Sequence, residues 1–350
     1  MIGLALLAAC TRDGGDTGLD LSITAKEHAR VTANGAPLQL TLYQNEGRRC
    51  GRSGQFSFLV IEREAKEEAP LWVFLHGGGV GYYDDGGYHP PDEESYNDAE
   101  DLASLQREVQ HVVGEDWSKD TAMARAISQG WRVLVPSLCD HDMYLGLGQD
   151  YPGNPGERVE GLLATEEALR FVEEGSATVP ARPTSRVVLM GMSAGAVGAH
   201  ALAMRREEAE RPVGAVLLDS LLWSRARQDL ADSGCTPQQR AEPDFDWGAV
   251  GEKLGPFLED PALYPEAVVG SSVSPRFNLY ALNDPACCGD RELLSQATGY
   301  ASNCAWAYAG FDENAAFPND YYRYEGQEHG LMAEEGEWQS RVEAWLYAVL

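Results

Sequence analysis

The chain has 350 residues, and its 55 acidic against 27 basic side chains give it a formal net charge of −28. This excess of acid argues against binding nucleic acid or an anionic membrane through a basic face, because such binding needs clustered lysine and arginine. The hydrophobic share of 44% is enough for a core and argues against global disorder. The composition indicates an acidic globular protein, long for one average domain but suited to an α/β core with insertions.

The first ten residues look like the end of a bacterial lipoprotein signal. A small apolar run ends in Leu7-Ala8-Ala9-Cys10, and cleavage before Cys10 would leave it as the lipid-carrying N-terminus. The run is short and lacks basic residues, so we expect the true start to lie upstream; an ordinary apolar N-terminus is the alternative. Residues 11–20 are polar and glycine-rich, as in a flexible tether. We predict an exported lipoprotein of the cell envelope, at the outer membrane or cell surface, that touches the membrane only through this anchor.

Export would also account for the six further cysteines, since disulfides persist in oxidising compartments. Six cysteines allow many pairings, and the sequence does not choose among them. Adjacent Cys287 and Cys288 are expected to serve two different partners. No cysteine has the C-x-x-C spacing of a zinc site, so a zinc site is not expected. No metal or other cofactor is predicted. The six are Cys50, Cys139, Cys235, Cys287, Cys288 and Cys304.

Strands and helices alternate along residues 21–350, which we expect to form one domain. Strands are predicted at 38–43, 55–61, 71–75, 131–136, 187–190, 213–218, 276–282 and 319–324. Helices are predicted at 120–129, 157–174, 196–210 and 334–350, a long loop at 80–98, and a cap insertion at 219–270. The alternation predicts a mostly parallel sheet covered by helices on both faces, with catalytic groups at the carboxyl ends of its strands.

The segment Val187–Gly195 has the strand–turn–helix context of a nucleophile elbow. An apolar run enters Gly191-Met192-Ser193-Ala194-Gly195, and a helix-forming segment follows. Glycines flank Ser193 because a Cβ at either position would collide with neighbouring backbone in so sharp a turn. The other interpretation is a glycine-rich turn with a spectator serine. The elbow interpretation predicts the α/β-hydrolase fold, with Ser193 exposed at the end of a strand as the nucleophile.

A serine hydroxyl needs a base to take its proton and an acid to orient that base. In this fold the base follows the other two along the chain. The histidines after Ser193 are His200 and His329. His200 lies two helical turns beyond the elbow, which carries it away from the site, so the predicted base is His329, in a loop after the last strand.

The acid should lie on a loop after one of the late strands. Asp284 ends the segment Asn278–Asp284 and is the favoured acid. Asp219, which ends the strand before, is the competitor; its other interpretation is a carboxylate that holds backbone N–H groups or shapes the pocket. Asp290 and Asp312 are weaker candidates.

A tetrahedral intermediate needs two preorganised N–H donors for its oxyanion. One would come from Ala194, which follows the nucleophile, and the other from Gly77 and Gly78 in the run His76–Gly79. This run directly follows a buried strand, which supports the assignment. We expect His76 to brace the loop rather than to act as the base.

Two further groups have less specific patterns. Asp140-His141-Asp142 superficially resembles a metal cluster, but we favour a structural or substrate-shaping loop at the rim of the site. Loop aromatics can stack on a sugar or act as packing anchors, and the sequence leaves both open for Tyr82, Tyr83, Tyr88 and Trp223.

Five features from about Trp72 to His329 occur together: Gly77–Gly79, a strand ending in Cys139-Asp140, the elbow Gly191–Gly198, Asn283-Asp284 and Glu328-His329. With these features the chain resembles the pectin acetylesterase/Notum family of α/β-hydrolases. The resemblance implies a metal-independent carboxylesterase that removes acyl groups such as acetate from a polysaccharide or another decorated substrate. His-Gly-Gly-Gly is also similar to the oxyanion motif of hormone-sensitive-lipase-like esterases.

The sequence therefore predicts a serine esterase in which Ser193 attacks an ester carbonyl, His329 moves the proton and Asp284 orients the imidazolium. A lipase or peptidase on the same scaffold is one alternative, and a non-catalytic surface lipoprotein that binds glycan or protein is another. A residue at every triad position argues against the non-catalytic alternative. The expected partner is a small-molecule or polysaccharide ester, not nucleic acid.

Overall fold

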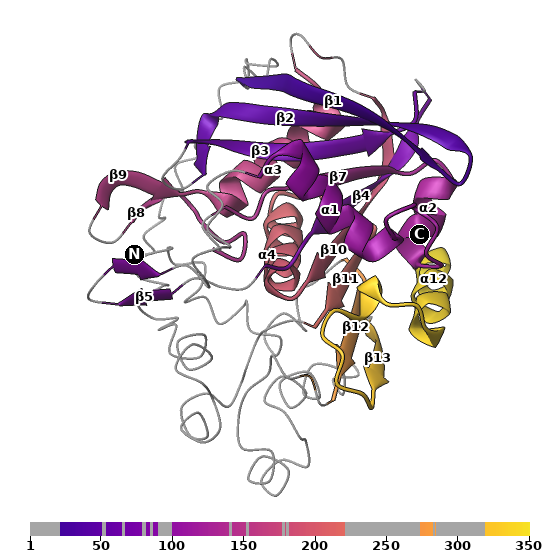
Figure 1. Cartoon of the computed structure of the whole chain (residues 1–350). Helices are drawn as coiled ribbons and strands as arrows, with labels where there is room; N and C mark the ends of the chain where they lie inside the picture. Colours follow the sequence, from indigo (N-terminus) through magenta and orange to yellow (C-terminus); the bar gives the residue numbers. More distant parts are fainter. Residues whose placement is uncertain are drawn as a thin grey trace, which may run out of the picture.

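A computed structural model of the chain is shown in Figure 1. Its described residues form a large mixed sheet with helices on both faces. The expected lipid anchor Cys10, the tether and residues 221–270 of the expected cap lie outside the described residues. The described residues are 22–50, 54–64, 67–78, 82–84, 87–89, 100–139, 142–151, 154–176, 179, 182–220, 274–282, 284 and 319–350.

The main sheet of the described residues has nine strands in the order β1-β2-β3-β7-β4-β10-β11-β12-β13. The strands from β1 to β7 pair antiparallel, and those from β7 to β13 pair parallel. In Figure 1 the antiparallel half lies at the top and β13 at the bottom. The bounds are Ile23–Ala33 (β1), Ala36–Cys50 (β2), Gly54–Glu62 (β3), Ala69–Leu75 (β4), Arg132–Pro136 (β7), Thr184–Met192 (β10), Ala215–Asp219 (β11), Arg276–Ala281 (β12) and Asn319–Tyr324 (β13).

The central strands are buried on both faces, which explains their continuous apolar sequences. Along β4, Leu71, Val73 and Leu75 pack into one core, and Trp72 and Phe74 pack into the other. All five side chains are almost fully buried. A strand that must satisfy two cores carries no polar face, as expected for the parallel part of an α/β sheet.

Helices α3 and α4 contribute to one core, and α1, α2 and α12 contribute to the other. Figure 1 shows α4 beside β10 and α2 close to α12. A short 3₁₀ turn, η3, precedes the last helix. The bounds are Leu102–Val113 (α1), Ala122–Ser128 (α2), Gly161–Glu174 (α3), Ala194–Glu208 (α4), Leu331–Ala333 (η3) and Glu337–Val349 (α12).

The sequence-based prediction omits β1 and α1. Strand β1 lies at the sheet edge and most of its side chains are exposed, so it has no hydrophobic alternation to detect. Helix α1 does carry a signal, because its buried residues recur at helical spacing and Asp101 caps its first turn by accepting the Ser104 N–H. The buried residues are Leu102, Leu105, Val109, Val112 and Val113.

Two short hairpins occur where the sequence predicts the start of a helix and a loop. The helix predicted from residue 157 begins at Gly161, and Asn154–Val159 is a strand, β9, paired with β8 at Gln149–Tyr151. Val159 is buried, so its apolar side chain fits a helical pattern although the backbone is extended. In the predicted loop 80–98, Tyr82–Asp84 (β5) pairs with Gly87–His89 (β6). Short strands that pair only with each other leave little periodic signal.

One disulfide is present among the described residues, between Cys50 at the end of β2 and Cys139 just after β7. Strand β3 lies between these two strands, so the bond spans it. Both cysteines are fully buried. The sequence predicts disulfides without choosing partners, and the remaining four candidates lie outside the described residues. No helix of the described part combines the length and apolarity that a bilayer span requires.

Candidate active site

Strand β10 ends and helix α4 begins at Ser193, whose backbone has φ 56° and ψ −121°. A positive φ is costly for a residue with a Cβ, so the turn holds the serine in a strained conformation. A Cβ at Gly191 would lie 2.1 Å from the carbonyl oxygen of Gly195, and one at Gly195 would lie 2.0 Å from that of Leu75. Both positions therefore require glycine, and Ser193 sits in the predicted elbow.

The glycine run after β4 packs directly against this serine. A Cβ at Gly77 would lie 3.1 Å from the Ser193 Cβ and 3.7 Å from its Oγ. Ser193 is 7% exposed, which differs from the predicted exposure at the end of the strand. Ala194 is fully buried at the start of α4, and exposed Gly78 follows Gly77. Of the three residues predicted to bind an oxyanion, Ala194 follows Ser193 in the chain and Gly77 packs against it. Gly78 is the residue after Gly77.

His329 and Asp284 meet through their side chains, with His329 Nδ1 at 2.7 Å from Asp284 Oδ2. Asp284 follows β12 and His329 follows β13, and these neighbouring strands run parallel. Loops after parallel strands emerge at the same edge of a sheet, which brings acid and base together. In a serine triad the acid holds the imidazole through Nδ1 and Nε2 serves the nucleophile. The predicted acid–base pair therefore has the required bond.

The loop that carries His329 also lies against the elbow. Its next residue, Gly330, has φ 80°, and a Cβ there would lie 3.0 Å from Sδ of Met192, the residue before Ser193. The positive φ favours glycine at this position, and the contact with the Met192 side chain is tight. The His329 loop and the Ser193 turn are consequently in direct packing contact.

Asp219, the competing acid, is fully buried and binds backbone N–H groups of this same loop. Its Oδ1 accepts from Leu331 at 3.0 Å and its Oδ2 from Met332 at 2.7 Å. Burial raises the pKa of Asp219 to about 6, although the Met332 N–H and the charge of His329 act in the opposite direction. These contacts match the alternative interpretation of Asp219 as a carboxylate that holds backbone N–H groups.

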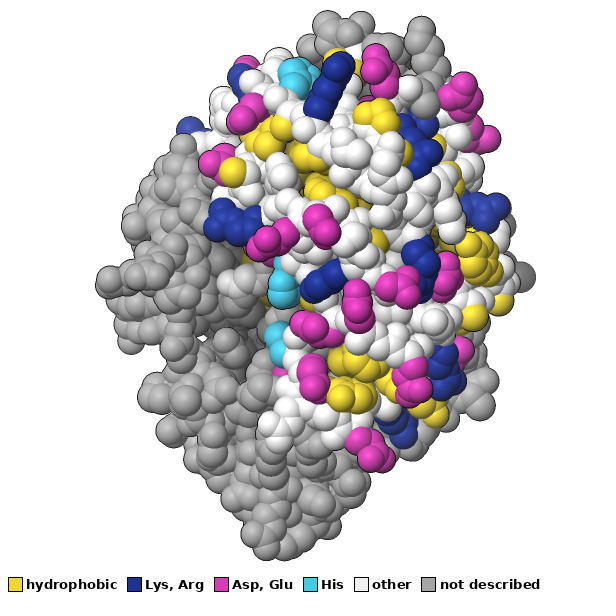
Figure 2. Space-filling view, turned by 45° about the vertical axis from the view of Figure 1, so that its right-hand side comes forward, with side chains coloured by type: hydrophobic (Ala, Val, Ile, Leu, Met, Phe, Trp, Pro, Cys, Tyr) yellow, Lys and Arg dark blue, Asp and Glu magenta, His cyan; other side chains and the backbone are white. Residues whose placement is uncertain are grey.

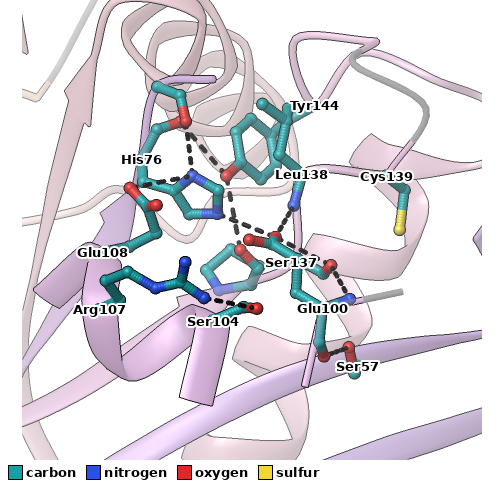
Figure 3. A network of polar contacts seen from close by, with 12 residues as sticks. Ser57, His76, Glu100, Ser104, Arg107, Glu108, Ser137, Leu138, Cys139 and Tyr144 are labelled. Atoms are coloured by element: carbon teal, nitrogen blue, oxygen red, sulfur yellow. Dashed lines mark hydrogen bonds and ion pairs between the residues drawn. The ribbon is translucent and has the colours of Figure 1, made fainter. Parts of the chain in front are cut away.

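His76 links the glycine loop to acidic side chains, and Figure 3 shows its ring between Glu100 and Glu108. Its Nδ1 lies 2.6 Å from the Gly77 carbonyl oxygen and its Nε2 lies 3.0 Å from Oε2 of Glu100. Burial lowers the pKa of His76, but the charge and hydrogen bond of Glu100, together with Glu108, outweigh burial and raise it to about 9. Near neutral pH the ring is an imidazolium that donates through both nitrogens. It therefore holds the loop and has no lone pair with which to accept a proton.

Glu100 is a functional candidate that the sequence-based prediction does not include. Besides His76, its Oε2 accepts the Ser137 hydroxyl at 3.0 Å and the Leu138 N–H at 2.8 Å. The local run Asp98-Ala99-Glu100-Asp101 has several acids and no motif, so nothing in it distinguishes this carboxylate. Its importance comes from the fold, which places the segment after β7 beside the end of β4.

Asp142 has a structural environment in the described part of the chain. Its buried carboxylate accepts N–H groups from Tyr144, Gly146 and Gly161 at 2.8, 2.9 and 3.0 Å. Burial raises the pKa of Asp142 to about 6 despite these bonds. Within the described residues, no group of three or more His, Cys, Asp and Glu side chains could hold a metal ion. Asp140 and His141 lie outside those residues.

The remaining candidates lie elsewhere or are not described. His200 is buried within α4 and contacts Arg276, the first residue of β12. It therefore lies away from the carboxyl ends of the strands, as predicted. Three of the loop aromatics belong to the β5–β6 hairpin. Asp290, Asp312 and Trp223 fall outside the described residues.

No family model matches this chain, and no curated protein matches its sequence. Solved structures do match. An S-formylglutathione hydrolase from Agrobacterium tumefaciens is similar over 93% of this chain and 100% of its own, with a TM-score of 0.56 at 12% identity. An acetyl xylan esterase from Paenibacillus sp. R4 is similar over 94% of this chain and 89% of its own, with a TM-score of 0.50 at 15% identity. At these identities the similarity establishes the fold, and the chain has the α/β-hydrolase fold predicted from its elbow.

Proposed function

We propose that this protein is a serine carboxylester hydrolase. The observation that supports it most directly is the 2.7 Å bond between His329 and Asp284, on a loop packed beside the strained Ser193. In this proposal the Ser193 hydroxyl attacks the ester carbonyl while His329 takes its proton and Asp284 stabilises the imidazolium. His329 then returns the proton to the leaving alcohol, and water attacks the acyl–serine by the same route to release the acid.

The oxyanion of each tetrahedral intermediate would be bound by backbone N–H groups of Ala194 and of the glycine loop. The Gly77 carbonyl and the Gly78 N–H belong to one trans peptide unit, so they point in opposite directions within its plane. His76 engages the Gly77 carbonyl, which turns the Gly78 N–H away from His76. This orientation supports Gly78 as a donor at the serine.

The proposed substrate is an acylated, and first of all acetylated, polysaccharide or similar ester. The resemblance to pectin acetylesterases supports an acetyl group, and one structural neighbour is an acetyl xylan esterase by name. The net charge of −28 disfavours a polyanionic backbone. On the face shown in Figure 2, acidic and basic side chains are interspersed without a contiguous basic patch. We therefore propose a neutral acetylated glycan in preference to pectin.

The cellular site proposed for this activity is the cell envelope, with Cys10 as the lipidated residue. Metabolic labelling with a palmitate analogue tests this part separately from the chemistry. The full chain should take up the label and lose it in Cys10→Ala, whereas label that persists in the variant would contradict anchoring through Cys10.

The reaction is tested with the full chain and p-nitrophenyl acetate, followed by acetate release from acetylated xylan and from pectin. Ser193→Ala should abolish turnover, because it removes the nucleophile. Ser185→Ala is the matched control, since Ser185 is an exposed residue at the opposite end of the same strand, β10. Turnover that survives in Ser193→Ala would overturn the proposal. Glycan binding without acetate release would favour the non-catalytic alternative.

A further inference from the structure

Two adjacent residues at the end of β11 connect the base loop to the nucleophile turn. Asp219 is the last residue of β11 and lies in register with Met192 on β10. Its carbonyl oxygen accepts the Ser193 N–H at 2.9 Å. The side chain of this same residue points to the other segment, the loop that follows His329. The nucleophile and the base loop thus share one buried anchor.

This anchor takes up successive backbone N–H groups directly after His329. The Gly330 N–H donates to Ser220 Oγ at 2.9 Å, and the next two N–H groups donate to the Asp219 carboxylate. The Ser220 hydroxyl in turn donates to Asp219 Oδ1 at 3.1 Å. Both side chains are buried, so water does not offer the loop an equivalent partner in this geometry.

The carbonyl side of the same turn is held by α12. Trp338 Nε1 donates to the Leu331 carbonyl at 2.8 Å, and Gln339 Nε2 donates to the Met332 carbonyl at 3.1 Å. The backbone after His329 is therefore bound on both sides, and on the Asp219 side the bonds lead straight to Ser193. A carboxylate that accepts two N–H groups is a stronger anchor than a neutral acceptor would be.

We propose that Asp219 is a positioning residue that sets the separation between the His329 loop and Ser193, whereas Asp284 orients the imidazole ring. This inference rests on the proposed hydrolase function and adds a second carboxylate to it. Asp219 acts through the backbone and does not touch the reacting atoms. Its removal should disturb the alignment of base and nucleophile, and a misplacement near 1 Å costs about 10²-fold in rate.

The test is Asp219→Asn in the full chain, assayed with p-nitrophenyl acetate. The amide keeps the shape but turns one acceptor into a donor that faces a backbone N–H. We expect kcat to fall about 10- to 100-fold while KM stays within about twofold. Glu160→Gln is the matched control, because the 5% exposed Glu160 carboxylate also accepts a backbone N–H, from Arg49 on β2 at 3.0 Å. The control should keep the wild-type kcat at a comparable loss of thermal stability.

A double-mutant cycle separates positioning from general stability. In a His329→Ala background, Asp219→Asn should cost almost nothing further, because the loop no longer carries the base. An equal fold-loss in both backgrounds would overturn the inference. Ser220→Ala removes the Gly330 bond and the hydroxyl bond to Asp219 but leaves both backbone N–H bonds of the carboxylate in place. It provides a milder variant should Asp219→Asn not fold, and its kcat should fall several-fold.

The outcomes also distinguish this inference from the function on which it rests. A wild-type protein without esterase activity would overturn both. An active wild-type protein whose kcat is unchanged in Asp219→Asn and Ser220→Ala would overturn only the positioning role.

Discussion

His329 and Asp284 are 45 residues apart in sequence, yet their side chains are joined by a 2.7 Å hydrogen bond. The bond links the loops after β12 and β13, which are neighbours at the parallel edge of the sheet. Asp219 ends the next strand inward, so its carboxylate reaches the backbone of the His329 loop. Two carboxylates thus serve one histidine loop through different atoms, and substitutions at the two positions should have different signatures.

Asp284→Asn should lower kcat about 10³- to 10⁴-fold with little change in KM, because an amide favours the wrong imidazole tautomer and leaves the imidazolium uncompensated. Steady-state kinetics with p-nitrophenyl acetate measure this effect. Asp320→Asn is the control, since Asp320 lies near the start of β13 and its carboxylate accepts the neighbouring Tyr321 N–H. A loss at Asp284 no larger than that at Asp219 would contradict the division of roles.

Gly77→Ala should reduce kcat about 10²-fold or more while the protein remains folded, because the new methyl would press on the nucleophile and shift an oxyanion donor. Its Cβ would lie 3.1 Å from the Ser193 Cβ. Gly47→Ala introduces a similar contact, 3.3 Å from Asn45 Oδ1, on an exposed part of β2. Thermal unfolding and kinetics of both variants test the prediction, and equal kinetic losses in the two would refute a role specific to the site.

The features that could be predicted are those with a local signature or a fixed chain order. The elbow around Ser193 is a contiguous motif, and the order serine, acid, histidine reduces the choice of base to His329. Strand β4 is recognised because burial on both faces makes it continuously apolar. These signals do not depend on knowing which strands are neighbours.

The features that could not be predicted depend on contacts between distant segments. Glu100 has no motif, and its role arises only when β4 and β7 pair. The partner of Cys50 depends on the strand order, since β3 separates the two cysteine-bearing strands. Asp219 could be read as an acid or as a backbone anchor until the position of the His329 loop was known. In each case the chemistry of the residue was visible but its partner was not.

Removing the disulfide should destabilise the protein without abolishing activity. The bond joins Cys50 and Cys139 across 89 residues, and closing a loop of this length restricts the unfolded chain. Cys50→Ala/Cys139→Ala should therefore lower the free energy of unfolding by about 2–4 kcal/mol. Denaturant unfolding of the oxidised protein, the reduced protein and the double variant measures this. Reduction should shift the midpoint of the wild type, and a midpoint for the double variant equal to that of the oxidised wild type would contradict the prediction.

The buried pair His76–Glu100 should make stability depend on pH. The pKa of His76 is raised from 6.5 to about 9, with burial acting against the charges of Glu100 and Glu108. A raised folded-state pKa means that the stabilisation is fully present below pH 6.5 and is lost as the pH rises through about 9. Denaturant unfolding across this range should show a declining free energy of unfolding.

Glu100→Gln tests whether this decline comes from the pair, because the amide keeps the shape and removes the charge that raises the pKa of His76. The variant should be less stable than the wild type near neutral pH and should show a much smaller decline at higher pH. Among the described residues, Glu108 on α1 and the rings of Phe74 and Tyr144 also face His76, and all three remain in the variant. The strongly negative surface is unchanged because the substituted carboxylate is largely buried, so self-repulsion at high pH acts almost equally on both proteins. Parallel declines in wild type and variant would therefore assign the pH dependence to the surface and not to the ion pair.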